Sequence, residues 1–237
     1  MKKEDKFYLL EVDFMDLNGK WKLYYAPEGE NKLSSVFDLK KSGIPSVDAT
    51  VPGNVELDLS AAGILPKDLF KGMNILEAEK YENYEWWYEK TFSAPAAPDN
   101  EHKVVLHFGA VDCIADYYLN GEKIGESDNM FISQDFDVTD KVKYGEENTL
   151  HIHIASAVLK GASEDIEPNM ALLSWHATTV SLNVRKAPHS YGWDIMPRAV
   201  SAGIWRPVEL QYKKKYDFRY LYFKIRNMDG KDGIITL

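Results

Sequence analysis

Alternating apolar and polar residues predict that this chain is built mostly of β-strands. The period of two is clearest in KVVLHFGAV, NTLHIHI and PVELQYKK. Such alternation is typical of antiparallel strands that bury one face. The expected buried sides are Val104, Leu106, Phe108 and Ala110 in the first stretch, Leu150, Ile152 and Ile154 in the second, and Val208, Leu210 and Tyr212 in the third.

Local signals add a hairpin and a helix. In CIADYYLNGEKIGES, the pair Asn120-Gly121 suits the positive φ angles of a tight two-residue turn. In NVELDLSAAG, Asn54 is a suitable N-cap and Gly63 a suitable end, which predicts one short helix.

Two long connections, 26–85 and 157–203, separate the predicted strands. Many short strands with turn-rich connections, and no repeating βα unit, favour a β-sandwich. Long ordered loops in such a fold more often have a function than serve only to connect two strands. The second connection ends in SYGWDIMPRAVSAGIWRP, which is too apolar for an idle loop and too broken for a helix or a strand.

The pattern changes near QYKKKYDF, where a basic run precedes a new alternating stretch, RYLYFKIRNMDG. We therefore expect residues 1–213 to form one domain and residues 214–237 to be the truncated start of a second. A strand without a partner leaves backbone N–H and C=O groups unsatisfied. This tail is accordingly expected to be mobile or to pair with a neighbouring molecule.

Composition and charge narrow the classes of function. The 237 residues are 45% hydrophobic and 13% aromatic, which is ample for a core. The net charge is −9 and the Lys and Arg residues are scattered, which argues against nucleic acid or a membrane as a partner. MKKEDKFYLLEVDF lacks the apolar core of a secretory signal. The single Cys113 cannot form an internal disulfide.

Candidate catalytic and metal-binding residues are few. His107, His151 and His153 lie on outward strand faces, where solvated surface histidines are commoner than zinc ligands. Cys113 alternates with apolar residues, which predicts a small core residue rather than a nucleophile. No spacing singles out the paired carboxylates that a glycosidase needs. We expect no metal, no cofactor and no complete catalytic site.

YGWDIMPR is the segment most suited to binding a sugar. Trp stacks on the apolar faces of sugar rings, and a carboxylate accepts two hydroxyl hydrogen bonds, which makes Trp193 and Asp194 candidates. The alternative is that Trp193 anchors the core and Asp194 caps a turn. Arg198 either bridges to Asp194 or faces a substrate. In GIWRP, Trp205 and Arg206 are expected to pin the long connection by packing and by hydrogen bonds to loop carbonyls.

Longer stretches resemble the N-terminal sugar-binding domain of glycoside hydrolase family 2, in its β-mannosidase branch. VPGNVELDLSAAGILP, LFKGMN and YEWWYEKTF are similar to the opening of that branch. HFGAVDCIADYYLNGEKIGES and FDVTDKVKYGEENTLHIHI resemble its core strands and Asn-Gly hairpin. RKAPHSYGWDIMPRAVSAGIWRPVEL is similar to the signature that ends in Gly-Ile-Trp-Arg. The resemblance covers nearly the whole chain.

The resemblance implies an all-β fold, a jelly-roll (galactose-binding-domain-like) β-sandwich with long loops and one short helix. In the family, an immunoglobulin-like domain and a (β/α)₈ barrel follow this domain, and the barrel carries the acid/base and nucleophile glutamates. The catalytic pair of the family therefore matches no residue here. Residues 214–237 would begin the immunoglobulin-like domain.

The resemblance also implies a substrate-binding loop. In the β-mannosidase branch, a loop with the sequence Trp-Asp-Trp reaches from the first domain into the pocket of the barrel and contacts the sugar. Trp193 and Asp194 match its first two positions, whereas Ile195 and Met196 stand where Trp and Gly usually follow. This change removes an aromatic wall, so β-linked sugars other than mannose become candidates. We expect Trp193, Asp194 and Arg198 to bind the substrate.

The leading hypothesis is a non-catalytic N-terminal domain of an exo-acting, retaining β-glycosidase that is inactive by itself. Its partner would be a β-linked carbohydrate, bound together with the barrel. The alternatives are a stand-alone carbohydrate-binding module and a structural domain that buttresses the barrel without touching sugar. The family suggests a periplasmic or secreted parent enzyme whose signal peptide is absent from this sequence.

Overall fold

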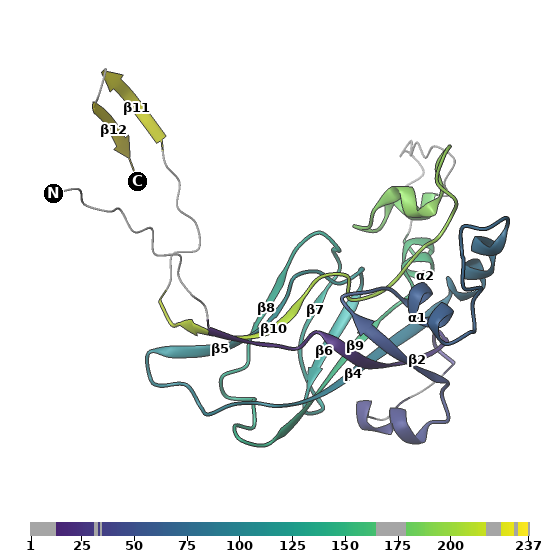
Figure 1. Cartoon of the computed structure of the whole chain (residues 1–237), viewed down its shortest axis with the longest axis horizontal. Helices are drawn as coiled ribbons and strands as arrows, with labels where there is room; N and C mark the ends of the chain where they lie inside the picture. The colour runs from purple at the N-terminus through teal and green to yellow at the C-terminus, as the bar shows by residue number, and fades with distance from the viewer. Residues whose placement is uncertain are drawn as a thin grey trace.

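Two antiparallel sheets pack face to face to form a β-sandwich (Figure 1). The computed structural model describes residues 13–30, 33, 35–164, 179–216, 224–229 and 232–236. The larger sheet has the order β3-β2-β4-β9-β6-β7, with β2 Gly19–Pro27, β3 Ser46–Val51, β4 Tyr84–Ser93, β6 Ala115–Leu119, β7 Glu122–Ser127 and β9 Glu147–Ile154. The smaller sheet has the order β1-β10-β5-β8, with β1 Asp13–Asp16, β5 His102–Phe108, β8 Gln134–Asp137 and β10 Val208–Lys214. The prediction of an all-β, galactose-binding-like sandwich is confirmed.

The core between the sheets contains the side chains that the alternation predicted. Phe108 of β5 and Tyr117 of β6 are fully buried, with ring centroids 4.7 Å apart, and Phe136 of β8 lies 4.7 Å from Tyr117. Burial of such apolar surface is the main driving force for joining the sheets. Leu106, Leu150, Ile152, Ile154, Val208 and Leu210 are likewise buried, as expected.

The predicted hairpin and helix are both present. Asn120 and Gly121 have φ angles of 52° and 87°, so both adopt the left-handed conformation that a two-residue turn between β6 and β7 requires. Helix α1, Val55–Ala61, begins where Asn54 Oδ1 accepts a hydrogen bond from Leu57 N at 3.0 Å. A second short helix, α2 Ala157–Ala162, was not predicted. In the described part of the chain, no helix has the length and apolarity needed to cross a membrane.

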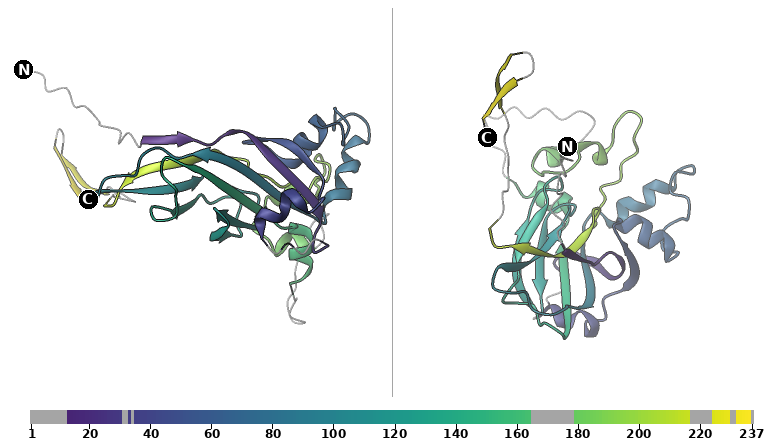
Figure 2. Two further views of the ribbon diagram at one scale, coloured as in Figure 1. Left: turned by 90° about the horizontal axis from the view of Figure 1, so that it is seen from below. Right: turned by 60° about the vertical axis from the view of Figure 1, so that its left-hand side comes forward.

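The connection at 26–85 has more structure than the sequence analysis predicted. It contains the 3₁₀ helices η1 Val36–Lys41 and η2 Asn74–Tyr81 as well as β3 and α1. The 3₁₀ helices η3 Thr179–Leu182 and η4 Pro188–Tyr191 lie in the second connection. In Figure 1, the short helices gather at the end of the sandwich opposite the β5 label, and the left view of Figure 2 also shows them at one end. The two long connections therefore meet at the same end of the fold.

The prediction that His151 and His153 are solvated is wrong. Both point away from the central core, but η1 covers that face of the large sheet with a second apolar cluster that includes Trp87. His151 is 1% exposed and meets the Glu89 carboxylate at 3.3 Å. His153 stacks on Trp87, with ring centroids 4.2 Å apart, and its Nε2 lies 3.1 Å from Glu85. Each histidine is thus paired through Nε2 with a carboxylate on the neighbouring strand β4, while His151 Nδ1 is buried with no hydrogen-bond partner among the described residues.

The C-terminal residues form a separate hairpin. Strands β11 Lys224–Asp229 and β12 Asp232–Thr236 pair only with each other among the described residues. In Figures 1 and 2 this hairpin stands apart from the sandwich. The expectation that the strand lacks a partner within its own chain is therefore wrong, because β12 supplies that partner. The start of the alternating stretch, residues 219–223, lies outside the described residues, and a domain boundary near residue 214 stays a prediction.

Asp58 of α1 gives the fold a testable pH dependence. Its Oδ1 accepts a hydrogen bond from Thr50 N at 3.0 Å, whereas Oδ2 is buried with no hydrogen-bond partner among the described residues. Burial raises the pKa of Asp58 from 3.8 to about 6, and the Thr50 hydrogen bond offsets this only in part. The folded state therefore binds this proton more tightly than the unfolded state, and the associated stability is lost as the pH rises from about 4 to 6.

Asp58→Asn is expected to remove that loss, because the amide keeps an acceptor for Thr50 and carries no charge. At pH 7 the variant should unfold with a free energy higher by about 2 kcal/mol, while at pH 4 it should resemble the wild type. Urea unfolding between pH 4 and 7 measures both values. Asp48→Asn, at an exposed position on β3, is the control and should change neither value. A stability difference that is the same at pH 4 and pH 7 would contradict the assignment.

Candidate functional site

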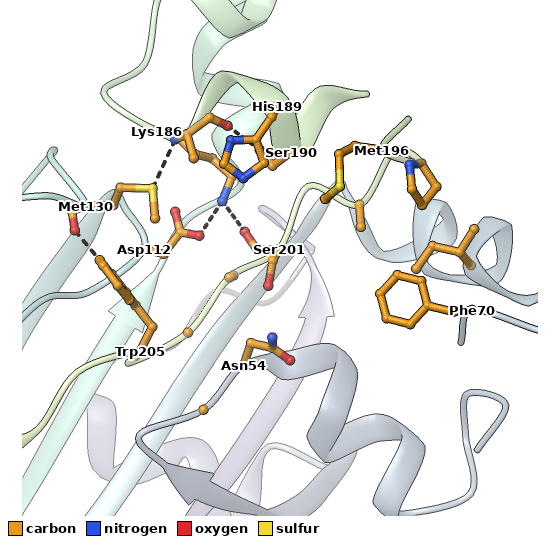
Figure 3. Close-up of a pocket in the computed structure, with 17 residues that line it drawn as sticks. Asn54, Phe70, Asp112, Met130, Lys186, His189, Ser190, Met196, Ser201 and Trp205 are labelled. Atoms are coloured by element: carbon orange, nitrogen blue, oxygen red, sulfur yellow. Dashed lines mark hydrogen bonds and ion pairs between the residues drawn. The ribbon is translucent and has the colours of Figure 1, made fainter. Parts of the chain in front are cut away.

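A cleft of about 360 Å³ opens between the start of α1 and the second long connection (Figure 3). Asn54 and Phe70 lie on one side, and His189 and Met196 lie on the other. Its lining is mostly apolar, with a few polar groups toward the floor. This size and lining are typical of small-molecule sites.

The segment 201–205 forms the floor of the cleft by bonding to both sides. Gly53 N donates to Ile204 O at 2.9 Å, and Asp112 N donates to Gly203 O at 2.8 Å. A Cβ at Gly203 would lie 2.8 Å from the Gly53 carbonyl oxygen, so no side chain fits at this crossing. The floor is therefore fixed by backbone contacts to two separate parts of the sandwich.

A buried ion pair lies beside this floor and lines the cleft. Lys186 Nζ donates to the Asp112 carboxylate and, at 2.6 Å, to the Ser201 carbonyl oxygen. Ser201 Oγ in turn donates to Glu56 Oε2 at 2.6 Å. Lys186 and Asp112 are only 3% and 7% exposed. Buried charges need partners of this kind, so the network attaches the second connection to the sandwich.

The buried carboxyls have raised pKa values. Burial raises the pKa of Asp112, and the Lys186 charge opposes this rise only in part. Burial likewise raises the pKa of Glu56, against the hydrogen bond from Ser201. Within the described ranges, no cluster of three or more His, Cys, Asp or Glu side chains is arranged to hold a metal ion. Cys113, next to Asp112, is buried as predicted, and burial raises the pKa of its thiol to about 12.

The predicted loop is a short hairpin beside the cleft. Trp193 N donates to Met196 O at 2.9 Å, and Met196 N donates to Trp193 O at 3.1 Å. Asp194 and Ile195 form the tip and are exposed, and Trp193 is 50% exposed. Half of the Trp193 side chain therefore faces outward, which is unlike a core anchor. Met196 and Pro197 line the cleft, so the loop forms part of its rim.

Arg198 lies at the base of this loop and contacts Glu82. Its Nε and Nη2 atoms lie 2.7 Å from the two Glu82 carboxylate oxygens. Its Nη1 donates to Tyr191 O at 3.3 Å, and the guanidinium carbon lies 5.5 Å from the centroid of the Tyr191 ring. The hydrogen bonds to Glu82 raise the pKa of Arg198. The structure thus places Trp193 and Asp194 next to each other in the hairpin and Arg198 at its base, where it binds Glu82.

The expectation for GIWRP holds in a modified form. Trp205 Nε1 donates to the Met130 carbonyl oxygen at 3.1 Å, which ties the second connection to the turn at residues 128–131. The Arg206 guanidinium lies 4.5 Å above the Trp205 ring. The loop-carbonyl contact that was expected of Arg206 is thus made by Trp205, while Arg206 covers the indole.

Sequence reasoning missed Glu82, Lys186 and Asp112. Glu82 and Arg198 are 116 positions apart, and Asp112 and Lys186 are 74 positions apart, so no local pattern connects the partners. One signal was present, because Asp112 follows the apolar run of β5 in a stretch that reads as core. A charge in such a stretch indicates a buried partner elsewhere in the chain.

The region that contains the cleft and the loop matches known proteins. The family model for the glycosyl hydrolase 2 galactose-binding domain-like family matches residues 28–206. Beta-mannosidase B of Emericella nidulans is 35% identical over 188 residues, which cover 77% of this chain and 22% of the relative. Beta-mannosidase B of Thermothelomyces thermophilus is 38% identical over 161 residues, covering 68% and 18%. The chain thus spans about a fifth of the length of these curated relatives.

Solved structures agree with this match. Beta-D-mannosidase from Dictyoglomus thermophilum aligns with a TM-score of 0.76 at 31% identity, over 94% of this chain and 25% of that chain. A β-glucuronidase of Ruminococcus gnavus aligns with a TM-score of 0.58 at 20% identity, over 99% and 33%, and shows a shared fold. The sandwich, the residues matched and these relatives together show that the chain belongs to the glycosyl hydrolase 2 galactose-binding domain-like family.

Proposed function

We propose that this chain is the non-catalytic N-terminal domain of an exo-acting, retaining β-glycosidase of the β-mannosidase type. Its 192–197 loop would supply Trp193 and Asp194 to the sugar pocket of a separate catalytic (β/α)₈ barrel. The observation that carries the proposal is the exposure of both side chains at the tip of a hairpin whose base is held by ion-pair and backbone contacts. The names of the relatives support the choice of enzyme class.

The chemistry of the tip suits a sugar. Trp193 is half exposed and has an indole of the kind that stacks on pyranose rings, and the exposed Asp194 has a carboxylate, which is a group that accepts hydrogen bonds from adjacent hydroxyls. Ile195, at 88% exposed, adds apolar surface but no hydrogen-bond donor. We therefore propose a β-linked glycone recognised through two hydroxyls by Asp194, with Arg198 as a third residue of the site that acts from the base of the loop, where it binds Glu82.

Exposed apolar side chains near the loop support contact with another domain. Phe70 is 78% exposed and lines the same cleft as Met196. Ile195 adjoins Met196 at the tip. Grouped apolar side chains on a surface are typical of sites that another protein domain covers. This grouping favours the proposal over a stand-alone carbohydrate-binding module.

The isolated chain is expected to hydrolyse no aryl β-glycoside, because the acid/base and nucleophile glutamates of the family match no residue here. Free monosaccharides should bind with dissociation constants of about 1 mM or weaker, since one stacked indole and a few exposed hydrogen bonds barely offset the entropy lost on association. Release of nitrophenol from 4-nitrophenyl β-glycosides and calorimetric titration test the two statements. Turnover that persists through further purification would contradict the first, and micromolar affinity would favour the stand-alone module.

A further inference from the structure

We propose that the Glu82–Arg198 pair fixes the direction of the 192–197 loop, so that Glu82 and Arg198 are positioning residues for the sugar contacts of Trp193 and Asp194. This inference rests on the proposed function of the loop. Its geometry, however, is a property of the chain itself, so the two can be tested separately.

The base of the loop is closed by hydrogen bonds from Arg198 and Ala199 to residues 190 and 191. Ala199 N donates to Ser190 O at 2.9 Å, and Arg198 Nη1 donates to Tyr191 O at 3.3 Å. Tyr191 is buried, and its ring lies beneath the guanidinium. The tip residues therefore extend from a base that packs on the buried Tyr191.

Glu82 belongs to a different and well-anchored part of the fold. It lies between η2 and β4, and its carbonyl oxygen accepts a hydrogen bond from Ser156 Oγ at 2.5 Å. The next residue, Asn83, accepts a hydrogen bond through its carbonyl from Glu28 N at 2.9 Å. These contacts join Glu82 to the end of β2 and to the start of α2. The Glu82 backbone is thus anchored at a point that is separate from the 192–197 loop.

The contact between the two parts is directional. A guanidinium that binds both oxygens of a carboxylate through Nε and Nη2 is held in one plane, whereas a lysine ammonium forms a point contact. The Glu82 and Arg198 side chains are 12% and 25% exposed, so water screens the pair less than a surface ion pair. The Arg198 guanidinium also donates to the Tyr191 carbonyl oxygen, so a change in the orientation of this side chain alters a contact at the base of the loop.

The test follows the position of Trp193 directly. The full chain is labelled with 5-fluorotryptophan, and the Trp193 signal in the ¹⁹F spectrum is assigned from Trp193→Phe. Glu82→Gln and the milder Arg198→Lys are compared with Arg185→Gln, which removes an exposed ion pair to Asp128 in the same connection. We expect Glu82→Gln to shift or broaden the Trp193 signal, Arg198→Lys to give a smaller change of the same kind, and Arg185→Gln to leave the signal in place.

The second readout is the activity of the proposed parent enzyme, which joins this domain to the catalytic barrel, on 4-nitrophenyl β-D-mannopyranoside. Glu82→Gln should lower kcat/KM about 10-fold, because a displaced binding loop misplaces the sugar relative to the reacting groups. An unchanged Trp193 signal in both Glu82→Gln and Arg198→Lys would contradict the proposal that the Glu82–Arg198 pair positions the loop. A change of equal size in Arg185→Gln would contradict it as well. If the signal moves but Asp194→Ala leaves kcat/KM unchanged, the proposed sugar contact fails and the positioning of the loop stands.

Discussion

Asp194→Ala in the proposed parent enzyme, which joins this domain to the catalytic barrel, is expected to lower kcat/KM for an aryl β-glycoside by roughly 10²-fold or more, with Tm nearly unchanged. Asp194 is exposed at the tip of the 192–197 hairpin, and the contacts of an exposed carboxylate typically contribute only about 0–1 kcal/mol to stability. A charged hydrogen bond to a sugar hydroxyl is worth about 1.5–3 kcal/mol and strengthens as charge develops on the ring in the transition state. Steady-state kinetics and thermal unfolding of the same preparation measure the two effects.

The control for this variant is Asp140→Ala, which removes an exposed aspartate from a turn outside the site. It should change neither kcat/KM nor Tm. If Asp194 caps the turn instead of binding sugar, the opposite pattern is expected, with a lower Tm and unchanged activity per folded molecule. That pattern would exclude Asp194 from the substrate site.

Lys186→Met is expected to lower the free energy of unfolding of this chain by about 3–5 kcal/mol. The variant leaves the Asp112 carboxylate buried without its cation, and it removes the hydrogen bond to the Ser201 carbonyl. Both contacts hold the 201–205 segment at the floor of the cleft, so the variant should weaken the attachment of this segment to the sandwich. Urea unfolding at pH 7 measures the change.

The neighbouring residue supplies a matched control. Arg185 also forms an ion pair, with Asp128, but both side chains are more than 60% exposed. Arg185→Met should therefore cost about 0–1 kcal/mol. Combining Lys186→Met with Asp112→Asn should recover part of the loss, since no buried charge then remains. Equal effects of Lys186→Met and Arg185→Met would show that burial does not set the strength of these pairs.

Several parts of the fold could be predicted from the sequence because their causes are local. The alternation in β9 places Leu150, Ile152 and Ile154 on one face whatever surrounds the strand, since successive side chains point to opposite sides. Asn120-Gly121 carries the positive φ angles of its turn within two residues. Asn54 caps α1 through a hydrogen bond to an amide three positions later. The position and composition of the Trp-Asp loop could be read in the same way.

Other features depended on which segments meet in space. Alternation indicated that His151 and His153 leave the central core. Only the packing of η1 over that face makes His151 buried, and only the pairing of β9 with β4 brings the two histidines to Glu89 and Glu85. The strand β3 alternates as regularly as β9, yet it was overlooked within a long connection.

The sequence by itself thus determined the strands β5, β9 and β10, the β6–β7 turn, the cap of α1 and the candidate loop residues Trp193 and Asp194. Only the tertiary structure decided what holds them in place. The Glu82–Arg198 contact joins residues 116 positions apart, and a charge pair at that separation leaves no periodicity along the chain. The physical reason is that side-chain direction follows from backbone geometry over a few residues, whereas the partner of a buried charge is chosen by the packing of whole segments.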